Sequence, residues 1–323
     1  MLSTTGTRAV VLGASRDANA KVTMLLTPHG APRPVLAVKT ATTERAGQVV
    51  LAEAALLRAL AAAPLGVIRA QIPTVCAVSQ WRGQPAMVCT ALPGVPLTVA
   101  YHRWRHTARR VSVTRDLTAV LDWCGRLQAV SSGPVSTVTW GVELLPRMAA
   151  RHAGSPRLES ALMVLAPAAE RLACVSTPRT VVHGDLWAGN VLLEDGRVTG
   201  VVDWEAGSLL GEPLRDLARA VLSYALYLDR HTGVGRRVAG HPGLRADRWG
   251  AGVRYLLSGR GWFPDLGRAL LRQGLERLGV DSGRWRDVAL IGLAEVAATA
   301  DHLGFATEHL ELLAHIDREG GPQ

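Results

Sequence analysis

Residues 181–205 read VVHGDLWAGNVLLEDGRVTGVVDWE. Two apolar segments, 191–193 and 198–202, flank the short polar sequence Glu194-Asp195-Gly196-Arg197. Asp-Gly tolerates the positive φ angles that a tight hairpin turn requires. The pattern therefore predicts a β-hairpin whose return strand ends at Asp203.

Four polar residues surround this predicted hairpin. His183, Asp185 and Asn190 precede its first strand, and Asp203 follows its second, so the hairpin would bring them together. Phosphoryl transfer needs such a set, because one carboxylate orients and deprotonates a hydroxyl while a carboxylate and an amide oxygen hold magnesium. Alternatively, the first three are ordinary turn residues and Asp203 is a strand cap. We favour the chemical interpretation because all four positions share one strand context.

The spacing His183-x-Asp185-x4-Asn190, followed by Val-Val-Asp-Trp-Glu at 201–205, resembles the aminoglycoside phosphotransferase and choline kinase family. These small-molecule kinases share the protein kinase fold. Gly184 stands where the protein kinase catalytic loop has arginine, and Trp204-Glu205 stands where the metal loop has Phe-Gly. The differences indicate the small-molecule branch of the fold.

The resemblance implies an α+β, bilobal, protein-kinase-like fold. A small β-rich lobe would span residues 1–91 and bind the nucleotide, and a larger, mainly helical lobe would span residues 92–323 and bind the acceptor. The implied reaction is magnesium-dependent transfer of the γ-phosphate of ATP or GTP to a hydroxyl of a small molecule. Such an acceptor is an aminoglycoside-like antibiotic, an amino sugar or a related metabolite.

The resemblance also assigns roles to residues. Asp185 is the expected base, and His183 belongs to the catalytic loop, where we expect it to support the loop more than to carry protons. Asn190 and Asp203 are the expected Mg²⁺ ligands. Backbone groups of the segment from Cys89 to Ala91 would face the adenine. Asp216, in a helix predicted to open within residues 211–218 with Pro213 in its first turn, would prop up the catalytic loop, or it is only an acid favoured by the helix dipole.

Lys39 is the expected phosphate ligand. It ends the apolar segment 35–38 and is one of only two lysines, with Lys21, among 36 basic residues. Glu53 lies on the apolar stripe of a helix predicted around residues 48–62, where a carboxylate needs a cationic partner. The sequence therefore predicts a Lys39–Glu53 ion pair, with Glu44 as an alternative partner or Lys39 as a solvated charge.

Strands are predicted at 8–13, 21–26, 35–40, 72–79 and 86–91. The loop between the first two would cover the phosphates, yet it lacks the Gly-x-Gly-x-x-Gly pattern and has one glycine, Gly13. Helices are predicted around 117–127, 157–173, 265–279, 284–303 and 305–318, with a loop at 231–250. The glycine-poor loop keeps open a second function, that of a catalytically inactive nucleotide-binding pseudokinase. A choline, amino-acid or sugar kinase of the same fold is a further alternative.

Charge and composition narrow the classes of partner. The net charge of +9 arises in residues 1–177, which carry 19 basic and 8 acidic residues, whereas residues 178–323 carry 17 and 19. A chain so rich in Ala, Gly, Val and Arg indicates high-GC coding more than a nucleic-acid surface, so we expect no nucleic-acid partner. The nearly balanced second half favours an acceptor with at most one or two positive charges.

The remaining sequence features concern location. No apolar run reaches about 18 residues, and the start of the chain has no basic segment followed by an apolar one, so we expect a cytoplasmic protein without a membrane partner. The four cysteines are widely spaced in apolar sequence and are expected to be reduced core residues. They are Cys76, Cys89, Cys124 and Cys174. Nothing in the sequence indicates an oligomeric state.

Overall fold

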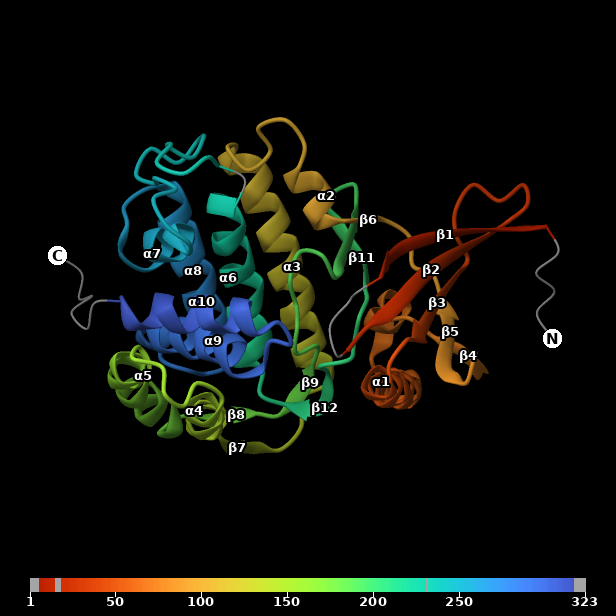
Figure 1. Cartoon of the computed structure of the whole chain (residues 1–323), viewed down its shortest axis with the longest axis horizontal. Helices are drawn as coiled ribbons and strands as arrows, with labels where there is room; N and C mark the ends of the chain where they lie inside the picture. Colours follow the sequence, from red (N-terminus) through yellow and green to blue (C-terminus); the bar gives the residue numbers. More distant parts are fainter. Residues whose placement is uncertain (1–5, 15–18, 231, 317–323) are drawn as a thin grey trace. The chain divides into compact units, whose positions relative to one another are not determined.

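The structure is a computed structural model that describes residues 6–14, 19–230 and 232–316. The chain forms two compact units (Figure 1). Unit 1 comprises Met1–Leu97, His183–Asp185 and Gly189–Leu209, and unit 2 comprises Thr98–Val182, Leu186–Ala188 and Leu210–Gln323. The division of the chain into lobes after residue 91 stays a prediction.

Unit 1 is built on a five-stranded antiparallel sheet with the strand order β1-β2-β3-β5-β4. Its strands are β1 (Thr7–Ala14), β2 (Lys21–Pro28), β3 (Leu36–Ala41), β4 (Val75–Trp81) and β5 (Gln84–Thr90). All five predicted strands are present, with ends shifted by a few residues. The β-rich part of the predicted α+β fold is thereby confirmed.

Helix α1 (Glu44–Ala62) packs against β3, β4 and β5, and the short 3₁₀ helix η1 (Gly66–Gln71) follows it. The Thr43 hydroxyl accepts a hydrogen bond from the backbone N–H of Ala46 at 3.1 Å. This N-cap satisfies one of the free donors of the first turn. It also explains why the helix begins four residues before the start predicted from its apolar periodicity. The buried face of α1 includes Glu53 beside Val50 and Leu57.

The predicted hairpin of residues 191–202 is confirmed. Strands β10 (Val191–Glu194) and β11 (Arg197–Val201) pair antiparallel, and β6 (Val95–Pro96) adds to the other edge of β10. Asp195 and Gly196, with φ of 51° and 75°, form the turn. Two successive positive φ angles match the twist of the flanking strands. The turn therefore sets the register that places Val201 opposite Val191.

Unit 2 is mainly helical, as predicted for the larger part of the fold. Its helices are α2 (Leu97–Tyr101), α3 (Arg110–Val130), α4 (Trp140–Arg151), α5 (Leu158–Ala173), α6 (Leu214–Arg230), α7 (Ala251–Ser258), α8 (Trp262–Arg277), α9 (Trp285–Thr299) and α10 (Leu303–Ala314), with the 3₁₀ helix η2 (Ser282–Arg284). Its short strands are β7 (Val135–Thr137), β8 (Ser176–Pro178) and β9 (Thr180–Val182), and β12 (Ser208–Gly211) lies where the chain passes from unit 1 to unit 2.

Helix α9 is central to unit 2, since it contacts α4, α5, α6, α8 and α10. Small residues allow the close approach: a Cβ on Gly292 would lie 2.7 Å from the Cβ of Ala218 in α6. Helices α2, α4 and α7 were not predicted. Helix α4 contains Pro146, which weakens a helical pattern, and α7 is only eight residues long.

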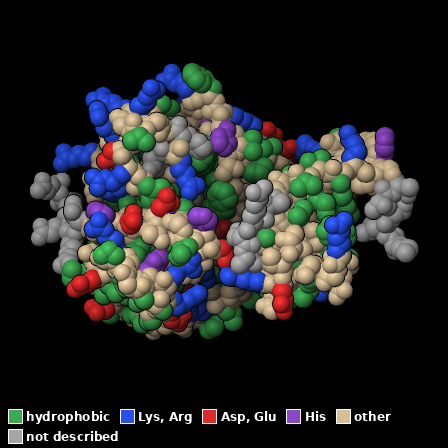
Figure 2. All heavy atoms as spheres, in the orientation of Figure 1, with side chains coloured by type: hydrophobic (Ala, Val, Ile, Leu, Met, Phe, Trp, Pro, Cys, Tyr) green, Lys and Arg blue, Asp and Glu red, His purple; other side chains and the backbone are tan. Residues whose placement is uncertain are grey.

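Two of the four cysteine predictions are wrong. Cys89 and Cys124 are buried as expected, but Cys76 and Cys174 are exposed, and all four are free thiols. Cys76 lies at an outward-facing position of β4, and Cys174 lies just after the end of α5. Their apolar sequence neighbours therefore did not imply that the thiols are buried. On the face shown in Figure 2, Lys and Arg side chains are dispersed among acidic and hydrophobic ones. No helix within the described residues has the length and hydrophobicity needed to cross a bilayer.

Candidate active site

Lys39 forms the centre of an ionic cluster in unit 1. Its ammonium lies 2.6 Å from Oε2 of Glu53 and 2.5 Å from Oδ1 of Asp203, and its side chain is only 12% exposed. Strand β3, helix α1 and the segment after β11 thus supply one residue each. The predicted Lys39–Glu53 ion pair is present, and Asp203 joins it.

The charges of this cluster reinforce one another. Burial alone would lower the pKa of Lys39, but the carboxylates of Glu53 and Asp203 outweigh it and hold the pKa above its ordinary value. Burial would raise the pKa of Asp203, yet the nearby Lys39 ammonium lowers it. Lys39 is therefore protonated and Asp203 ionised at neutral pH.

Glu53 also positions the chain that carries Asp203. Its Oε1 accepts a hydrogen bond from the backbone N–H of Trp204 at 3.0 Å. The Trp204 indole is fully buried and donates to the carbonyl of Val201 at 2.9 Å. Asp203 itself has a φ of 68°, a left-handed conformation that costs energy for most residues and less for aspartate. Contacts on both sides thus hold a strained residue in place.

His183 is fully buried and uses both ring nitrogens in backbone contacts. Its Nε2 lies 2.9 Å from the carbonyl oxygen of Val202, and its Nδ1 accepts the N–H of Asp185 at 3.2 Å. These bonds require the neutral tautomer with hydrogen on Nε2. The ring therefore links the segment that carries Asp185 to the strand leading to Asp203. The role of His183 in supporting a catalytic loop stays a prediction.

The backbone geometry at position 184 requires a glycine between His183 and Asp185. Its φ is 79°, and a Cβ at this position would lie 2.1 Å from the carbonyl oxygen of Ala206. Any side chain would therefore collide with backbone. The Asn190 amide nitrogen donates to the Asp185 carbonyl at 3.0 Å and lies 3.3 Å from its Oδ2. The structure thus brings Asp185 and Asn190 into contact.

The oxygen donors of this region suit a hard divalent cation. Carboxylate oxygens of Glu53, Asp203 and Glu205 lie within 4.8 Å of one another. An amide oxygen can also ligate such a cation, and the amide nitrogen of Asn190 is directed to Asp185. Oxygen-only ligand sets are those that Mg²⁺ and Ca²⁺ prefer. The residues therefore fit Mg²⁺, although Lys39 already engages one oxygen of Asp203.

Comparison with known proteins identifies the family. Residues 15–249 match the model of the phosphotransferase enzyme family, called APH. The matched residues are more than half of the chain. The chain belongs to the phosphotransferase enzyme family. No curated protein sequence matches this chain.

Several solved structures of aminoglycoside phosphotransferases share the family fold. A thermostable mutant of APH(4)-Ia in its apo form is 15% identical, with a TM-score of 0.57 and coverage of 95% of this chain and 94% of the other. APH(2'')-Ib with ADP is 13% identical, with a TM-score of 0.53 and coverage of 97% and 94%. APH(3'')-Id from Streptomyces rimosus is 14% identical, with a TM-score of 0.51 and coverage of 88% and 91%. At these identities the likeness establishes the protein-kinase-like fold.

Three residues of this ionic cluster were given no role in the sequence analysis. Lys21, at the start of β2, forms an ion pair with Oε2 of Glu205, and Asn19 donates to Oε1 of Glu205 at 3.3 Å. Burial and the Asp203 carboxylate raise the pKa of Glu205. The rarity of lysine in the chain singles out Lys21 as much as Lys39, and this signal was not used for Lys21.

The predicted adenine segment has little free hydrogen-bonding capacity in its amides. Cys89 lies in β5, and the N–H groups of Thr90 and Ala91 donate to the carbonyls of Thr74 and Val35 at 2.9 and 3.0 Å. A contact of adenine with this segment stays a prediction, and it would use carbonyl oxygens. The Cys89 thiol is buried, which raises its pKa to about 11 and keeps it neutral.

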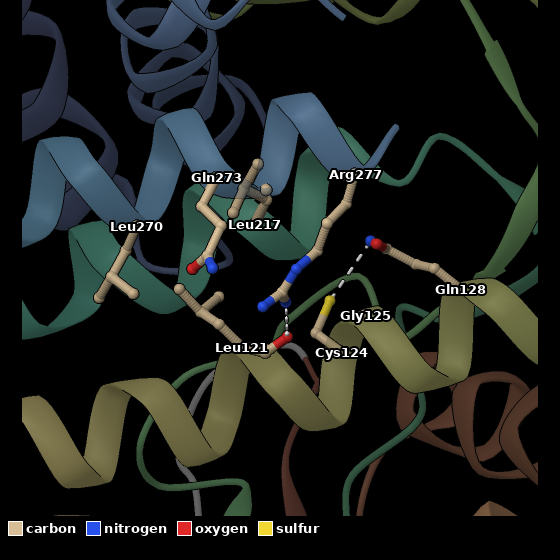
Figure 3. A pocket seen from close by; sticks show the side chains of 9 residues that line it. Leu121, Cys124, Gly125, Gln128, Leu217, Leu270, Gln273 and Arg277 are labelled. Atoms are coloured by element: carbon tan, nitrogen blue, oxygen red, sulfur yellow. Dashed lines mark hydrogen bonds between the residues drawn. The ribbon is translucent and has the colours of Figure 1, made fainter. Parts of the chain in front are cut away.

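Asp216 lies in the first turn of α6 in unit 2, is 1% exposed and borders Cys124. Its role in supporting the catalytic loop stays a prediction. A small hollow nearby lies between α3, α6 and α8 (Figure 3). Its volume of about 10 Å³ has room for about one water molecule. Arg277 and Gln128 close it by bonding to the Leu121 carbonyl and the Cys124 thiol, so this hollow is no acceptor pocket.

Proposed function

We propose that this phosphotransferase moves the γ-phosphate of a nucleoside triphosphate to a hydroxyl of a small molecule, with Mg²⁺ on the nucleotide. The observation that carries the proposal is the Lys39 cluster, in which one buried ammonium binds both Glu53 and Asp203. The catalytic-loop segment is tied to the same place, because His183 bonds the carbonyl next to Asp203. Structural pairs of this kind also occur without catalysis, but the family match favours the chemical interpretation.

In the proposed reaction, Asp185 orients the acceptor hydroxyl and accepts its proton as the oxygen attacks the γ-phosphorus. The bond between the γ-phosphorus and the bridging oxygen breaks, and its electron pair leaves with the nucleoside diphosphate. Lys39 binds the nucleotide phosphates, and Glu53 holds that ammonium in place. Asp203 and Asn190 would hold Mg²⁺, which neutralises the charge on the phosphate oxygens. His183 would support the conformation of the loop through its two backbone hydrogen bonds.

The solved relatives support the nucleotide and the acceptor class by analogy of fold. APH(4)-Ia forms ternary complexes with AMP-PNP and hygromycin B, and APH(2'')-IIa forms one with ATP and streptomycin. We propose an aminoglycoside-like antibiotic, an amino sugar or a related hydroxylated metabolite as acceptor for this chain. The balanced charge of residues 178–323 favours an acceptor with at most one or two positive charges.

A transfer assay tests the proposal. The purified protein is incubated with ATP or GTP, with and without Mg²⁺, and with a panel that covers aminoglycosides, amino sugars, choline and neutral sugars. We expect Mg²⁺-dependent phosphorylation of one class of acceptor and a turnover lowered by about 10²- to 10⁴-fold in Asp185→Asn. Much higher kcat/KM with a highly cationic aminoglycoside than with any sparsely charged compound would contradict the proposal that the acceptor carries at most one or two positive charges. Nucleotide binding without transfer across the panel would favour the pseudokinase.

A further inference from the structure

Lys21, the other lysine of the chain, lies in the same ionic cluster as Lys39. The Lys21 ammonium is ion-paired with Glu205, two residues after Asp203, and the Lys21 side chain is only 13% exposed. Asn19 approaches the other oxygen of Glu205. In a chain with 36 basic residues and two lysines, both lysines therefore bind carboxylates of the Asp203–Glu205 segment.

The sheet register explains this convergence. In the antiparallel pair of β2 and β3, Thr23 lies opposite Lys39, and Lys21 lies opposite Ala41. Side chains two residues apart in a strand point to the same face, so Lys21 and Thr23 share the face that carries Lys39. Lys21 and Lys39 are thus diagonal neighbours on one face of the sheet, within reach of each other's ligands.

Nucleotide phosphates require more positive charge than Lys39 provides. A triphosphate carries up to about four negative charges, of which a divalent cation neutralises two. In related kinases, backbone amides of a glycine-rich loop contribute further donors. The corresponding stretch of this chain has a single glycine, Gly13. A second ammonium beside Lys39 would add positive charge and side-chain donors to that contact.

We propose that Lys21 is a second ligand of the nucleotide β- and γ-phosphates, and that Glu205 holds its ammonium in position before the nucleotide binds. The inference rests on the proposed function, since it presupposes a nucleotide on this face of the sheet. When phosphate arrives, the Lys21 ammonium exchanges or shares its bond to the Glu205 carboxylate for one to phosphate oxygen. An ammonium is suited to this exchange, because it is a flexible point charge with three donors.

Nucleotide binding measured by calorimetry tests the inference. Lys21→Met keeps the apolar stem and removes the charge, and Arg58→Met removes one charge from an exposed site on α1 as the matched control. We expect Lys21→Met to weaken binding of Mg-ATP about 10- to 100-fold and binding of adenosine by less than about twofold. Arg58→Met should change neither. An ATP affinity of Lys21→Met within about twofold of the wild type would overturn the inference.

A second pair of variants separates binding from folding. Lys21→Met leaves Glu205 without this cation, so Lys21→Met/Glu205→Gln removes the unpaired charge and is expected to regain the wild-type melting temperature. The double variant should still bind ATP more weakly than the wild type. Recovery of the wild-type ATP affinity would overturn the inference. With ATP and EDTA, Glu205→Gln alone should bind more tightly than the wild type, because the Glu205 carboxylate no longer competes with phosphate for the Lys21 ammonium. Weaker binding there would overturn the proposed exchange of the Lys21 ammonium from Glu205 to phosphate.

The same titrations distinguish the two proposals from each other. A wild-type protein that binds no nucleotide would overturn the proposed function and this inference together. A wild-type protein that binds Mg-ATP and transfers its phosphate, with an unaffected Lys21→Met, would overturn this inference alone.

Discussion

Glu53 accepts a hydrogen bond from the backbone N–H of Trp204, and this bond joins helix α1 to the segment that carries Asp203. The other oxygen of Glu53 binds Lys39. One buried carboxylate therefore fixes both the proposed phosphate ligand and the chain beside the proposed metal ligand. Because Lys39 also binds Asp203, the three residues form a unit in which the loss of one member alters the others.

A double-mutant cycle on Lys39 and Glu53 follows from this unit. We expect Lys39→Ala and Glu53→Ala each to weaken binding of Mg-ATP, and the double variant to lose less than the sum of the two. The expected coupling energy is about 0.5 to 3 kcal/mol, as for residues in direct contact. Calorimetric titrations of the four proteins measure it. Additive losses would mean that the pair does not act as one unit in nucleotide binding.

Asp185→Asn should separate binding from chemistry. The amide retains the shape of the side chain but does not accept the hydroxyl proton, so kcat should fall by about 10²- to 10⁴-fold. The Kd for nucleotide should stay nearly unchanged, because the base acts in the transition state. Steady-state kinetics with the acceptor found in the transfer assay provide the test. Turnover near the wild-type rate would remove Asp185 from the role of base.

Asp203→Ala should abolish the Mg²⁺ dependence of nucleotide binding, because the carboxylate that the cation requires is removed. Alanine is also unfavourable at a φ of 68°, so Asp203→Asn is the better comparison, since asparagine tolerates this conformation. We expect Asp203→Asn to avoid the backbone strain of the alanine variant and to bind ATP equally with Mg²⁺ and with EDTA. An ATP affinity that still rises with Mg²⁺ in both variants would contradict the ligand assignment.

The sequence was most informative where short-range rules apply. The turn at Asp195-Gly196 and the alternation on either side predicted the hairpin, and the apolar stripe of α1 identified Glu53 as a buried acid in need of a cation. It was least informative where a contact depends on register between distant strands. The Lys21–Glu205 pair spans 184 positions, and nothing local to either residue indicates the other.

Glycine at position 184 offers a test of the loop geometry. Gly184→Ala would place a Cβ 2.1 Å from the Ala206 carbonyl oxygen, in addition to the cost of a φ of 79°. Gly30→Ala is the matched control, because Gly30 has a φ of 80° with no atom within 4 Å of the added Cβ. We expect the control to lose about 1 kcal/mol of unfolding free energy and Gly184→Ala to lose clearly more. Equal losses in urea unfolding would show that the loop relaxes around the added methyl group.

His309 in α10 should make the protein lose stability in mild acid. It is fully buried beside Trp249 and Phe305, and its Nδ1 donates to the Phe305 carbonyl at 2.8 Å. Burial, helped by the charges of Arg219 and Arg230, lowers the pKa of His309 to about 3.

Between pH 6.5 and about 3 the unfolded chain binds one proton more at His309 than the folded chain does, so stability falls as the pH falls. This contribution is complete above pH 6.5, and the loss below it reaches up to roughly 1.4 kcal/mol per pH unit. His309→Asn keeps a donor for the Phe305 carbonyl and does not titrate, so its melting temperature should fall less between pH 7 and pH 4.5 than that of the wild type. His315→Asn is the control, because His315 makes the same type of bond, to the Glu311 carbonyl, from an exposed position. A wild-type pH profile that His309→Asn leaves unchanged, or that His315→Asn flattens equally, would exclude His309 as the source of the acid sensitivity.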